Sequence, residues 1–198
     1  MTINLEFIPT LVFGLVIFSW FAFVAAFLLR RKPARAPDAK RDRGSITGVV
    51  FQGLAYAVVW TVRRPYFSPI ISASKPVEIV IATTTVALAF ASAWIAMAAV
   101  TALGKEWSVT ARLVEGHKLV TRGPYGRVRH PIYTSMFGML LATGLAVSHW
   151  IALVPAIVIF FAGTVIRVRS EERLLRKEFG SEFEAYARRV AAMLPGVY

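Results

Sequence analysis

Two groups of polar and titratable residues in this chain each stand at the edge of an apolar block. The first is the segment 123–133, with the sequence GPYGRVRHPIY, and it runs into the apolar block that begins at Ile132. The second is the pair Glu171-Glu172, which follows the end of that block. A carboxylate can hold an ammonium group, and a guanidinium such as that of Arg167 can hold a carboxylate. The two groups could therefore bind a charged ligand together.

Each group also has a purely structural interpretation. Pro131 is suited to the first turn of a helix, where its missing N–H would have no partner, so His130-Pro131 could simply begin a helix. Arg167 and Glu171 are four residues apart and could form an ordinary ion pair on a helix surface. The functional interpretation is that a helix start offers free N–H groups to an anion and that polar groups at membrane depth are costly unless they serve a site.

The composition is that of an integral membrane protein. Of the 198 residues, 57% are hydrophobic and 17% charged, whereas soluble domains have about 45 to 50% apolar and roughly 25% charged residues. The net charge of +12 fits an excess of Lys and Arg in cytoplasmic loops better than nucleic-acid binding, so we expect no nucleic-acid partner. The chain has no cysteine, and no HExxH, P-loop, GxGxxG or GxSxG motif, which argues against a metal site, a nucleotide loop or a serine nucleophile.

The elements that must position these groups are apolar helices. We expect an all-α membrane bundle of about five transmembrane helices, with the first retained rather than cleaved as a signal. The expected spans are 7–29, 46–62, 79–103, 132–149 and 150–166, the last two forming a hairpin that turns near Ser148 to Trp150. Gly104 is expected to end the third span, and Arg63-Arg64 to lie at the membrane interface. Residues 30–45 are expected to be a solvated basic loop, 118–122 a short extended segment and 167–189 an amphipathic tail helix.

The distribution of charge predicts the orientation of the bundle. With these spans, 20 of the 23 Lys and Arg residues fall in the loops after the first and third spans and in the tail. The positive-inside rule then places both polar groups in the cytoplasm. We divide the chain into three N-terminal spans with a basic loop, residues 1–103, and a core of loop, hairpin and tail, residues 104–198.

The polar segments together resemble a known family. The run 115–125 (EGHKLVTRGPY), the run 129–133 (RHPIY), the pair Glu171-Glu172 and a tail with Phe179-Gly180, Tyr186 and Leu194-Pro195 are similar to the isoprenylcysteine carboxyl methyltransferases. That family shares an RHPxYxG and EE signature with membrane phospholipid methyltransferases. The resemblance covers roughly residues 104–196. Ser135 replaces the last glycine of the signature, and we expect it to narrow the cavity.

The resemblance implies that S-adenosylmethionine binds in a pocket formed by the loop, the hairpin and the tail. It implies a catalytic role for Arg167, at the carboxylate of the acceptor. The cofactor-binding residues that it implies are His117, Lys118, Leu119, Val120, Tyr125, His130, Pro131, Ile132, Tyr133, Glu171 and Glu172. The spacing leaves open which of the two glutamates faces the cofactor.

The resulting hypothesis is a membrane methyltransferase that acts on a lipophilic acceptor entering from the bilayer, with membrane lipids as its surroundings and no metal. Carboxyl O-methylation of an isoprenylcysteine-like acceptor is favoured by Arg167, because a bare amine gains nothing from a nearby guanidinium. N-methylation of phosphatidylethanolamine is an alternative. A non-catalytic lipid-binding protein would bind no cofactor, and a membrane reductase would bind a nicotinamide cofactor instead.

Overall fold

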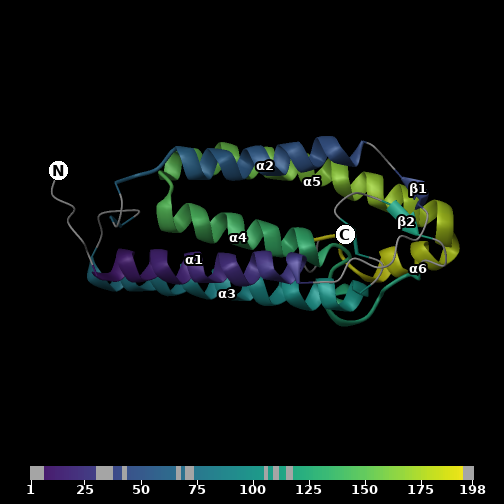
Figure 1. Cartoon of the computed structure of the whole chain (residues 1–198), viewed down its shortest axis with the longest axis horizontal. Helices are drawn as coiled ribbons and strands as arrows, with labels where there is room; N and C mark the ends of the chain where they lie inside the picture. The colour runs from purple at the N-terminus through teal and green to yellow at the C-terminus, as the bar shows by residue number, and fades with distance from the viewer. Residues whose placement is uncertain are drawn as a thin grey trace.

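Apolar helices make up most of this computed structural model. It describes residues 7–29, 38–41, 44–65, 68–69, 74–104, 107–108, 112–114 and 118–193, with only the backbone of 38–41 and 112–114. Within these residues, five long helices lie side by side (Figure 1). They are α1 (Phe7–Leu28), α2 (Ser45–Thr61), α3 (Lys75–Leu103), α4 (Pro131–Val147) and α5 (Trp150–Phe179).

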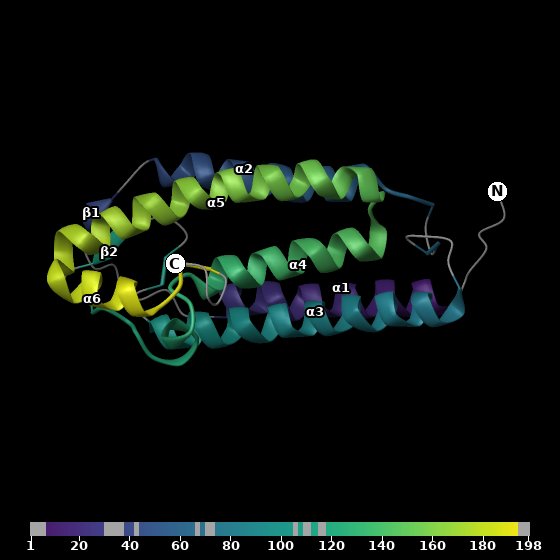
Figure 2. The ribbon, with the colours of Figure 1, turned by 180° about the vertical axis from the view of Figure 1, so that it is seen from behind.

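The helix α4 occupies the middle of the bundle. It lies between the pair α2 and α5 on one side and the pair α1 and α3 on the other, in the front view and from behind (Figures 1 and 2). One apolar core joins α4 to α1 and α3 through residues such as Val16, Ala93 and Met139. A second core joins α4 to α2 and α5 through residues such as Leu140 and Phe160. The helix α4 therefore packs against all four neighbouring helices.

The lengths of the helices indicate a multi-pass membrane protein. Among the described residues, α1, α3 and α5 are long and apolar enough to cross a membrane. The helices α2 and α4 are also apolar, with 17 residues each, which is at the lower limit of about 17 residues for a spanning helix. Many apolar side chains on the outside, such as Phe21, Trp94 and Val158, are exposed, as expected for surfaces that face lipid.

Glycines bring α2 and α5 into close contact. A Cβ atom on Gly163 would lie 2.7 Å from the carbonyl oxygen of Gly48, and one on Gly48 would lie 2.4 Å from Cγ of Arg167. Both distances are far shorter than a van der Waals contact, so neither position accepts a side chain without a shift of the helices. Small residues at such crossings let two backbones approach closely in a membrane.

Most expected helix boundaries are confirmed within one or two residues. The third span ends at Gly104, whose φ of +55° is costly for other residues, although α3 begins at Lys75 rather than at residue 79. The hairpin turns at Ser148-His149. The tail is divided differently from our expectation, since α5 continues without a break from the last span to Phe179. Gly180, with φ of +49°, then separates it from α6 (Ser181–Arg189).

One expectation about the loops is wrong. A strand β1 (Asp38–Arg41) lies within the segment expected to be a loop, and it pairs antiparallel with β2 (Arg112–Val114). The segment 118–122 belongs to no strand, the backbone of Arg122 is extended, and a short 3-10 helix, η2 (Gly123–Gly126), follows it. The strands are missed because three- and four-residue ladders depend on a distant partner and leave no periodic pattern. Over the described residues the fold is thus helical with one small ladder.

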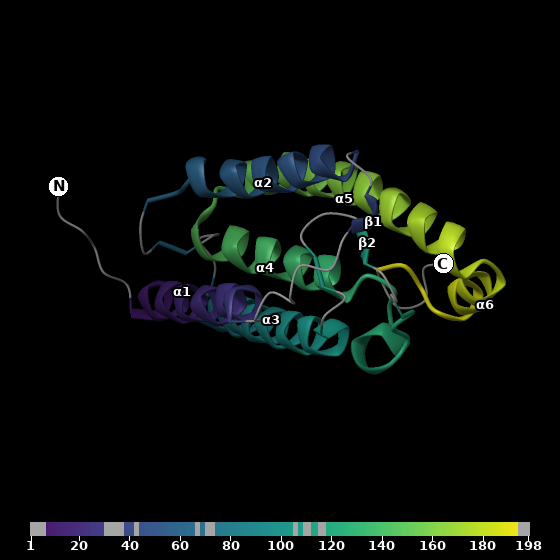
Figure 3. The same cartoon turned by 45° about the vertical axis from the view of Figure 1, so that its right-hand side comes forward.

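The two strands, the segment before α4 and the tail gather at one end of the bundle (Figure 3). The strands β1 and β2 and the helix α6 lie beyond the ends of α3 and α4, beside the extension of α5 (Figure 3). Two of the polar regions identified in the sequence, 123–133 and Glu171-Glu172, therefore meet at this end.

Arg64 holds the opposite end of the bundle together. Its guanidinium donates hydrogen bonds to four carbonyl oxygens: Ser68 (2.9 Å), Leu145 (2.8 Å), Ala146 (2.7 Å) and Ser148 (2.8 Å). The last carbonyls of a helix have no partner within it, so Arg64 satisfies the end of α4. Burial lowers the pKa of Arg64 to about 10, and the side chain still carries its charge at neutral pH. The position of Arg64 at the membrane interface stays a prediction, and the structure adds that its guanidinium caps α4.

We predict that Arg64→Leu destabilises the bundle by about 2 to 4 kcal/mol, because buried carbonyls lose a charged donor. Arg64→Lys should recover only part of this loss, since an ammonium group cannot reproduce the planar fork of donors. The measurement is the midpoint of thermal unfolding in detergent. Arg63→Leu, at the exposed neighbouring position, is the matched control, and an equal effect of both Leu variants would contradict the capping role.

Candidate functional site

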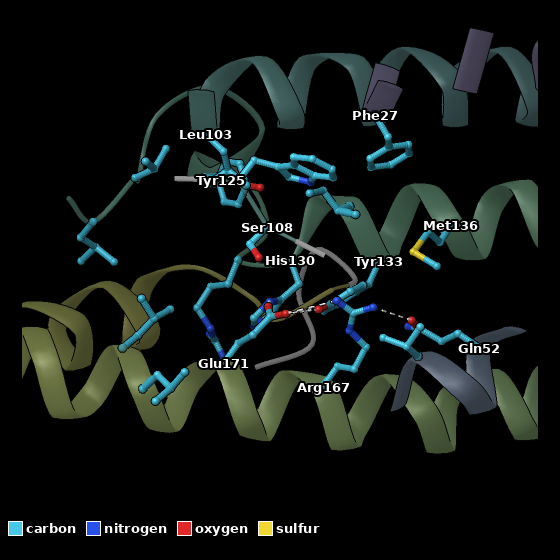
Figure 4. Close-up of a pocket in the computed structure, with 18 of the residues that line it drawn as sticks. Phe27, Gln52, Leu103, Ser108, Tyr125, His130, Tyr133, Met136, Arg167 and Glu171 are labelled. Carbon is cyan, nitrogen blue, oxygen red and sulfur yellow. Dashed lines mark hydrogen bonds and ion pairs between the residues drawn. The ribbon is translucent and has the colours of Figure 1, made fainter. Parts of the chain in front are cut away.

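A cavity of about 530 Å³ lies at the end of the bundle where the polar regions meet (Figure 4). Its wall includes residues from α1, α2, α4, α5, α6 and the segments between α3 and α4. The volume falls within the range of about 300 to 1,000 Å³ that is typical of small-molecule sites. One part of the wall is polar and contains Arg129, His130, Arg167 and Glu171, and the rest is mostly apolar.

His130 lies between the two glutamates, outside the membrane-spanning part of the helices. Its Nδ1 is 3.4 Å from Oε2 of Glu171, and its Nε2 is 3.2 Å from Oε1 of Glu172. Only a doubly protonated ring can donate to both carboxylates. Burial lowers the pKa of His130, but the hydrogen bonds and charges of both glutamates outweigh burial, so the net shift is upward. The ring is therefore held as an imidazolium ion.

Glu171 is the carboxylate that faces the cavity. Its side chain is 26% exposed, and besides His130 it accepts a hydrogen bond from the hydroxyl of Tyr133. Nη2 of Arg167 lies 3.7 Å from its Oε1. Burial raises the pKa of Glu171, but the hydrogen bond from His130 and the charges of His130 and Arg167 outweigh burial and lower it overall. Glu171 is therefore an ionised acceptor at the cavity wall.

Arg167 and His130 also contact the ring of Tyr133. The guanidinium of Arg167 lies over this ring, 4.9 Å from its centroid, and the ring of His130 stacks on it at 5.6 Å. Figure 4 shows these side chains from α4 and α5 converging on Glu171. The polar wall of the cavity is thus one connected cluster.

Glu172 points away from the cavity and binds basic side chains. Its Oε1 accepts from Nε of Arg129 at 2.9 Å, and its Oε2 accepts from Arg176 at 3.0 Å. Burial raises the pKa of Glu172, but the hydrogen bond and charge of His130 and the charge of Arg129 prevail and lower it to about 2. The spacing left open which glutamate faces the cofactor, and of the two only Glu171 lines the cavity.

The last described residues of the chain attach to the start of α4. The backbone N–H groups of Arg129 and His130 donate to the carbonyls of Ala191 (2.8 Å) and Ala192 (2.9 Å), and the guanidinium of Arg129 donates to the carbonyls of Ala187 (2.9 Å) and Val190. The hydroxyl of Tyr186 donates to the carbonyl of Tyr125 at 2.7 Å. The tail is therefore part of the wall and holds η2 against α6.

The structure brings most of the predicted site residues to one cavity. The lining residues among them are Lys118, Leu119, Val120, Tyr125, His130, Ile132, Tyr133, Arg167 and Glu171. Pro131 and Glu172 do not line it: Pro131 is fully buried in the first turn of α4, and Glu172 binds Arg129. His117 lies outside the described residues. Ser135 is fully buried, donates to the carbonyl of Ile132 and does not line the cavity, so it does not narrow the cavity as we expected.

Sequence reasoning missed the contribution of α1 and α2. Phe23, Phe27, Gly53, Tyr56 and Gln52 line the cavity, although the resemblance does not extend to these helices. Gln52 alone left a signal that could have been used, because it is an amide within an apolar run and polar groups at membrane depth need a partner. Among the described residues, no group of three or more His, Asp or Glu side chains is arranged to hold a metal ion.

Comparison with known proteins identifies a family and several relatives that each match about half of the chain. The sequence model of the phospholipid methyltransferase family matches residues 80–182, more than half of the chain. The nickel-cobalt-cadmium resistance protein NccN of Alcaligenes xylosoxydans xylosoxydans is 37% identical over 113 residues, 52% of each chain. The protein-S-isoprenylcysteine O-methyltransferase B of Arabidopsis thaliana is 32% identical over 89 residues, 45% of each chain.

A further relative is the cobalt-zinc-cadmium resistance protein CzcN of Cupriavidus metallidurans, 36% identical over 97 residues, which cover 47% of this chain and 43% of CzcN. The chain spans about half the length of the curated relatives it matches. The family match begins inside α3 and includes α4 and α5, so it contains the cluster around His130 and excludes α1 and α2.

The imidazolium of His130 predicts a stability that depends on pH. The folded protein raises the pKa of His130. The stability that the charged ring adds to the folded state is therefore complete below the ordinary pKa of about 6.5, and it is lost as pH rises through the raised pKa. Glu172 affects stability at acidic pH, because its pKa is lowered in the folded protein. The stability that its carboxylate adds is present above the ordinary pKa range of glutamate and is lost as pH falls toward about 2.

We therefore expect the unfolding midpoint of the wild type to fall between neutral and alkaline pH by more than that of His130→Gln. The two proteins are compared by thermal unfolding in detergent across this range. Parallel curves for the two proteins would mean that the ring is not held as an imidazolium ion.

Proposed function

The chain belongs to the phospholipid methyltransferase family, and on this premise we propose that it transfers a methyl group from S-adenosylmethionine to a lipophilic acceptor in the membrane. The observation that carries the proposal is that a single cavity connects the charged cluster at Glu171 with apolar residues of α1 and α2. A charged cofactor and a lipid-like acceptor need such neighbouring surfaces. The cavity beside Arg64 at the opposite end of the bundle is far smaller, about 30 Å³.

The residues of the polar wall fit the cofactor. Glu171 is an ionised acceptor that would hold the ammonium group of its methionine part. Leu119, Val120 and Tyr125 line the cavity on the side of η2 and would enclose the adenosine. When bound, the cofactor supplies a methyl group on a positively charged sulfonium, which is ready for attack by a nucleophile.

The residues near Arg167 would orient the acceptor. A carboxylate is already a nucleophile and has no proton to lose, so the chain need supply alignment and exclusion of water rather than a base. Arg167 is buried between α2 and α4, and its guanidinium is held over Tyr133 at the cavity wall. From this place it would bind a carboxylate by charge and hydrogen bonds. Arg167 is thus our candidate catalytic residue.

Charge favours an anionic acceptor. Among the described lining residues, the basic side chains of Lys118, Arg129, His130 and Arg167 outnumber the single carboxylate of Glu171. A positively charged acceptor would add to this excess of positive charge, whereas an acceptor with a carboxylate would reduce it. We therefore propose carboxyl O-methylation of an isoprenylcysteine-like acceptor, which is the reaction in the name of the Arabidopsis relative.

N-methylation of phosphatidylethanolamine is the second candidate, and the description of the matched family favours it. A direct comparison of the two acceptors with purified protein separates these reactions. The names of NccN and CzcN state resistance to metals and no acceptor. We propose that the cavity faces the cytoplasm, because its wall includes parts of the loop after the third expected span and of the tail. These two segments and the loop after the first expected span contain 20 of the 23 Lys and Arg residues in the sequence.

We predict that the detergent-purified protein binds S-adenosylhomocysteine in calorimetry. Glu171→Ala and His130→Ala should each weaken this binding tenfold or more, about 1.4 kcal/mol. Glu171→Ala removes the carboxylate that would accept from the ammonium group, and His130→Ala removes the ring that orients this carboxylate. Glu182→Ala, on the exposed face of α6, is the control and should bind as the wild type does. Absence of heat with the wild type at high ligand concentration would refute the methyltransferase proposal and support a non-catalytic protein.

We also predict that filling the apolar part of the cavity impairs the acceptor and not the cofactor. A Cβ atom on Gly53 would meet no atom within 4 Å, and Gly53 lines the cavity, so Gly53→Leu places a side chain in that space. Turnover of a prenylated acceptor should fall about tenfold with unchanged cofactor affinity. Gly14→Leu is the matched control, since Gly14 of α1 has equally open surroundings away from the cavity, and equal losses in both variants would contradict this assignment.

A further inference from the structure

Three buried side chains form a chain of hydrogen bonds between α2 and α5. The hydroxyl of Thr164 donates to the carbonyl of Phe160 at 2.8 Å. Nε2 of Gln52 donates to Oγ1 of Thr164 at 2.9 Å, and Nη1 of Arg167 donates to Oε1 of Gln52 at 3.2 Å. Gln52 is 1% exposed, Thr164 0% and Arg167 7%. Figure 4 shows Gln52 and Arg167 pointing toward each other at the edge of the cavity.

The direction of every bond in this chain follows from its chemistry. Thr164 has one hydroxyl hydrogen, and the carbonyl of Phe160 accepts it, so Oγ1 can only accept from Gln52. The amide nitrogen of Gln52 must then face Thr164, and its oxygen must face Arg167. A guanidinium has no acceptor and can only donate. Thr164 therefore fixes the orientation of the Gln52 amide, and the Gln52 oxygen fixes the guanidinium.

The backbone of α2 provides a second restraint on Arg167. The stem of Arg167 lies across Gly48, where an added Cβ atom would be 2.4 Å from Cγ and 3.3 Å from Cδ of the arginine. Gly48 and Gln52 are four residues apart and so lie on one face of α2. On one face of α2, Gly48 thus leaves space for the aliphatic part of the Arg167 side chain, and Gln52 binds its guanidinium.

Glu171 competes with Gln52 for the same guanidinium. Nη2 of Arg167 is 3.7 Å from Oε1 of Glu171, which is longer than a hydrogen bond. The two groups form a long ion pair at this distance. Without the bond from Nη1 to Gln52, an arginine beside a carboxylate in buried surroundings would shorten this ion pair to hydrogen-bond distance. The guanidinium would then turn toward Glu171 and away from Gln52.

We propose that Gln52 is a positioning residue that holds Arg167 back from Glu171 and so keeps a guanidinium ready for an anionic acceptor group. This inference rests on the proposed function, since it assigns the acceptor end of the same cavity. It also places a determinant of acceptor recognition on α2, outside the part of the chain that matches the methyltransferase family.

The test compares Gln52→Met with the wild type in methyl transfer to an S-farnesylated cysteine that carries a free carboxylate. Methionine is similar in length to glutamine and neither donates nor accepts a strong hydrogen bond. We expect the KM for this acceptor to rise about tenfold, with a smaller change in kcat and less than a twofold change in the Kd of S-adenosylhomocysteine. In an Arg167→Leu background the same substitution should have no further effect, because it acts through the arginine.

Thr164 provides a second, independent pair of variants. Thr164→Val removes the hydroxyl that orients the amide and should raise the same KM, whereas Thr164→Ser retains the hydroxyl and should behave as the wild type does. An equal loss from Gln52→Met with and without Arg167 would overturn the positioning role, and so would a loss of cofactor affinity that accompanies it. Wild-type protein that neither binds the cofactor nor methylates the acceptor would refute the proposed function itself, and the role of Gln52 with it.

Discussion

His130 carries its charge in a place where an isolated ion would be unstable, and the two carboxylates that compensate it come from a different helix. Glu171 and Glu172 are adjacent in α5 and lie on either side of the ring. Moving an unpaired ion out of water costs several kcal/mol, so neither the ring nor the glutamates can be removed singly without leaving a buried charge. The start of α4 is thereby fixed to α5 beyond the membrane-spanning part, and the cavity wall depends on that connection.

The remaining features of the site follow from this connection. It requires α5 to continue as a helix past its apolar part, since otherwise Glu171 and Glu172 would not reach the start of α4. Glu172 then binds Arg129, and Arg129 binds the carbonyls of the tail. Glu171 is left facing the cavity with Tyr133 and Arg167 beside it. Glu172 thus stabilises the contact between α5, the start of α4 and the tail, whereas Glu171 places a carboxylate at the cavity wall.

The sequence predicted what depends on local pattern and missed what depends on distant partners. Apolar runs, Gly104 and the turn at Ser148 define the helices, and the charged groups at 123–133 and Glu171-Glu172 defined most of the polar wall. The ladder of β1 and β2 and the cap formed by Arg64 join segments far apart in the chain. No periodic pattern of apolar residues in the sequence predicts such contacts. The choice between Glu171 and Glu172 required the rotation of α5 relative to α4, which packing determines and spacing does not.

The two halves of the chain contribute different surfaces to one cavity. The half that matches the methyltransferase family supplies His130, Tyr133 and Glu171, the groups that fit a charged cofactor. The helices α1 and α2, outside that match, supply apolar side chains and the open space at Gly53. Under the proposed function, relatives that use the same cofactor need similar residues around it, whereas relatives that use different acceptors need different residues around the acceptor. Acceptor recognition would therefore differ among relatives through α1 and α2, and Arg167, held by Gln52, lies where the two surfaces meet.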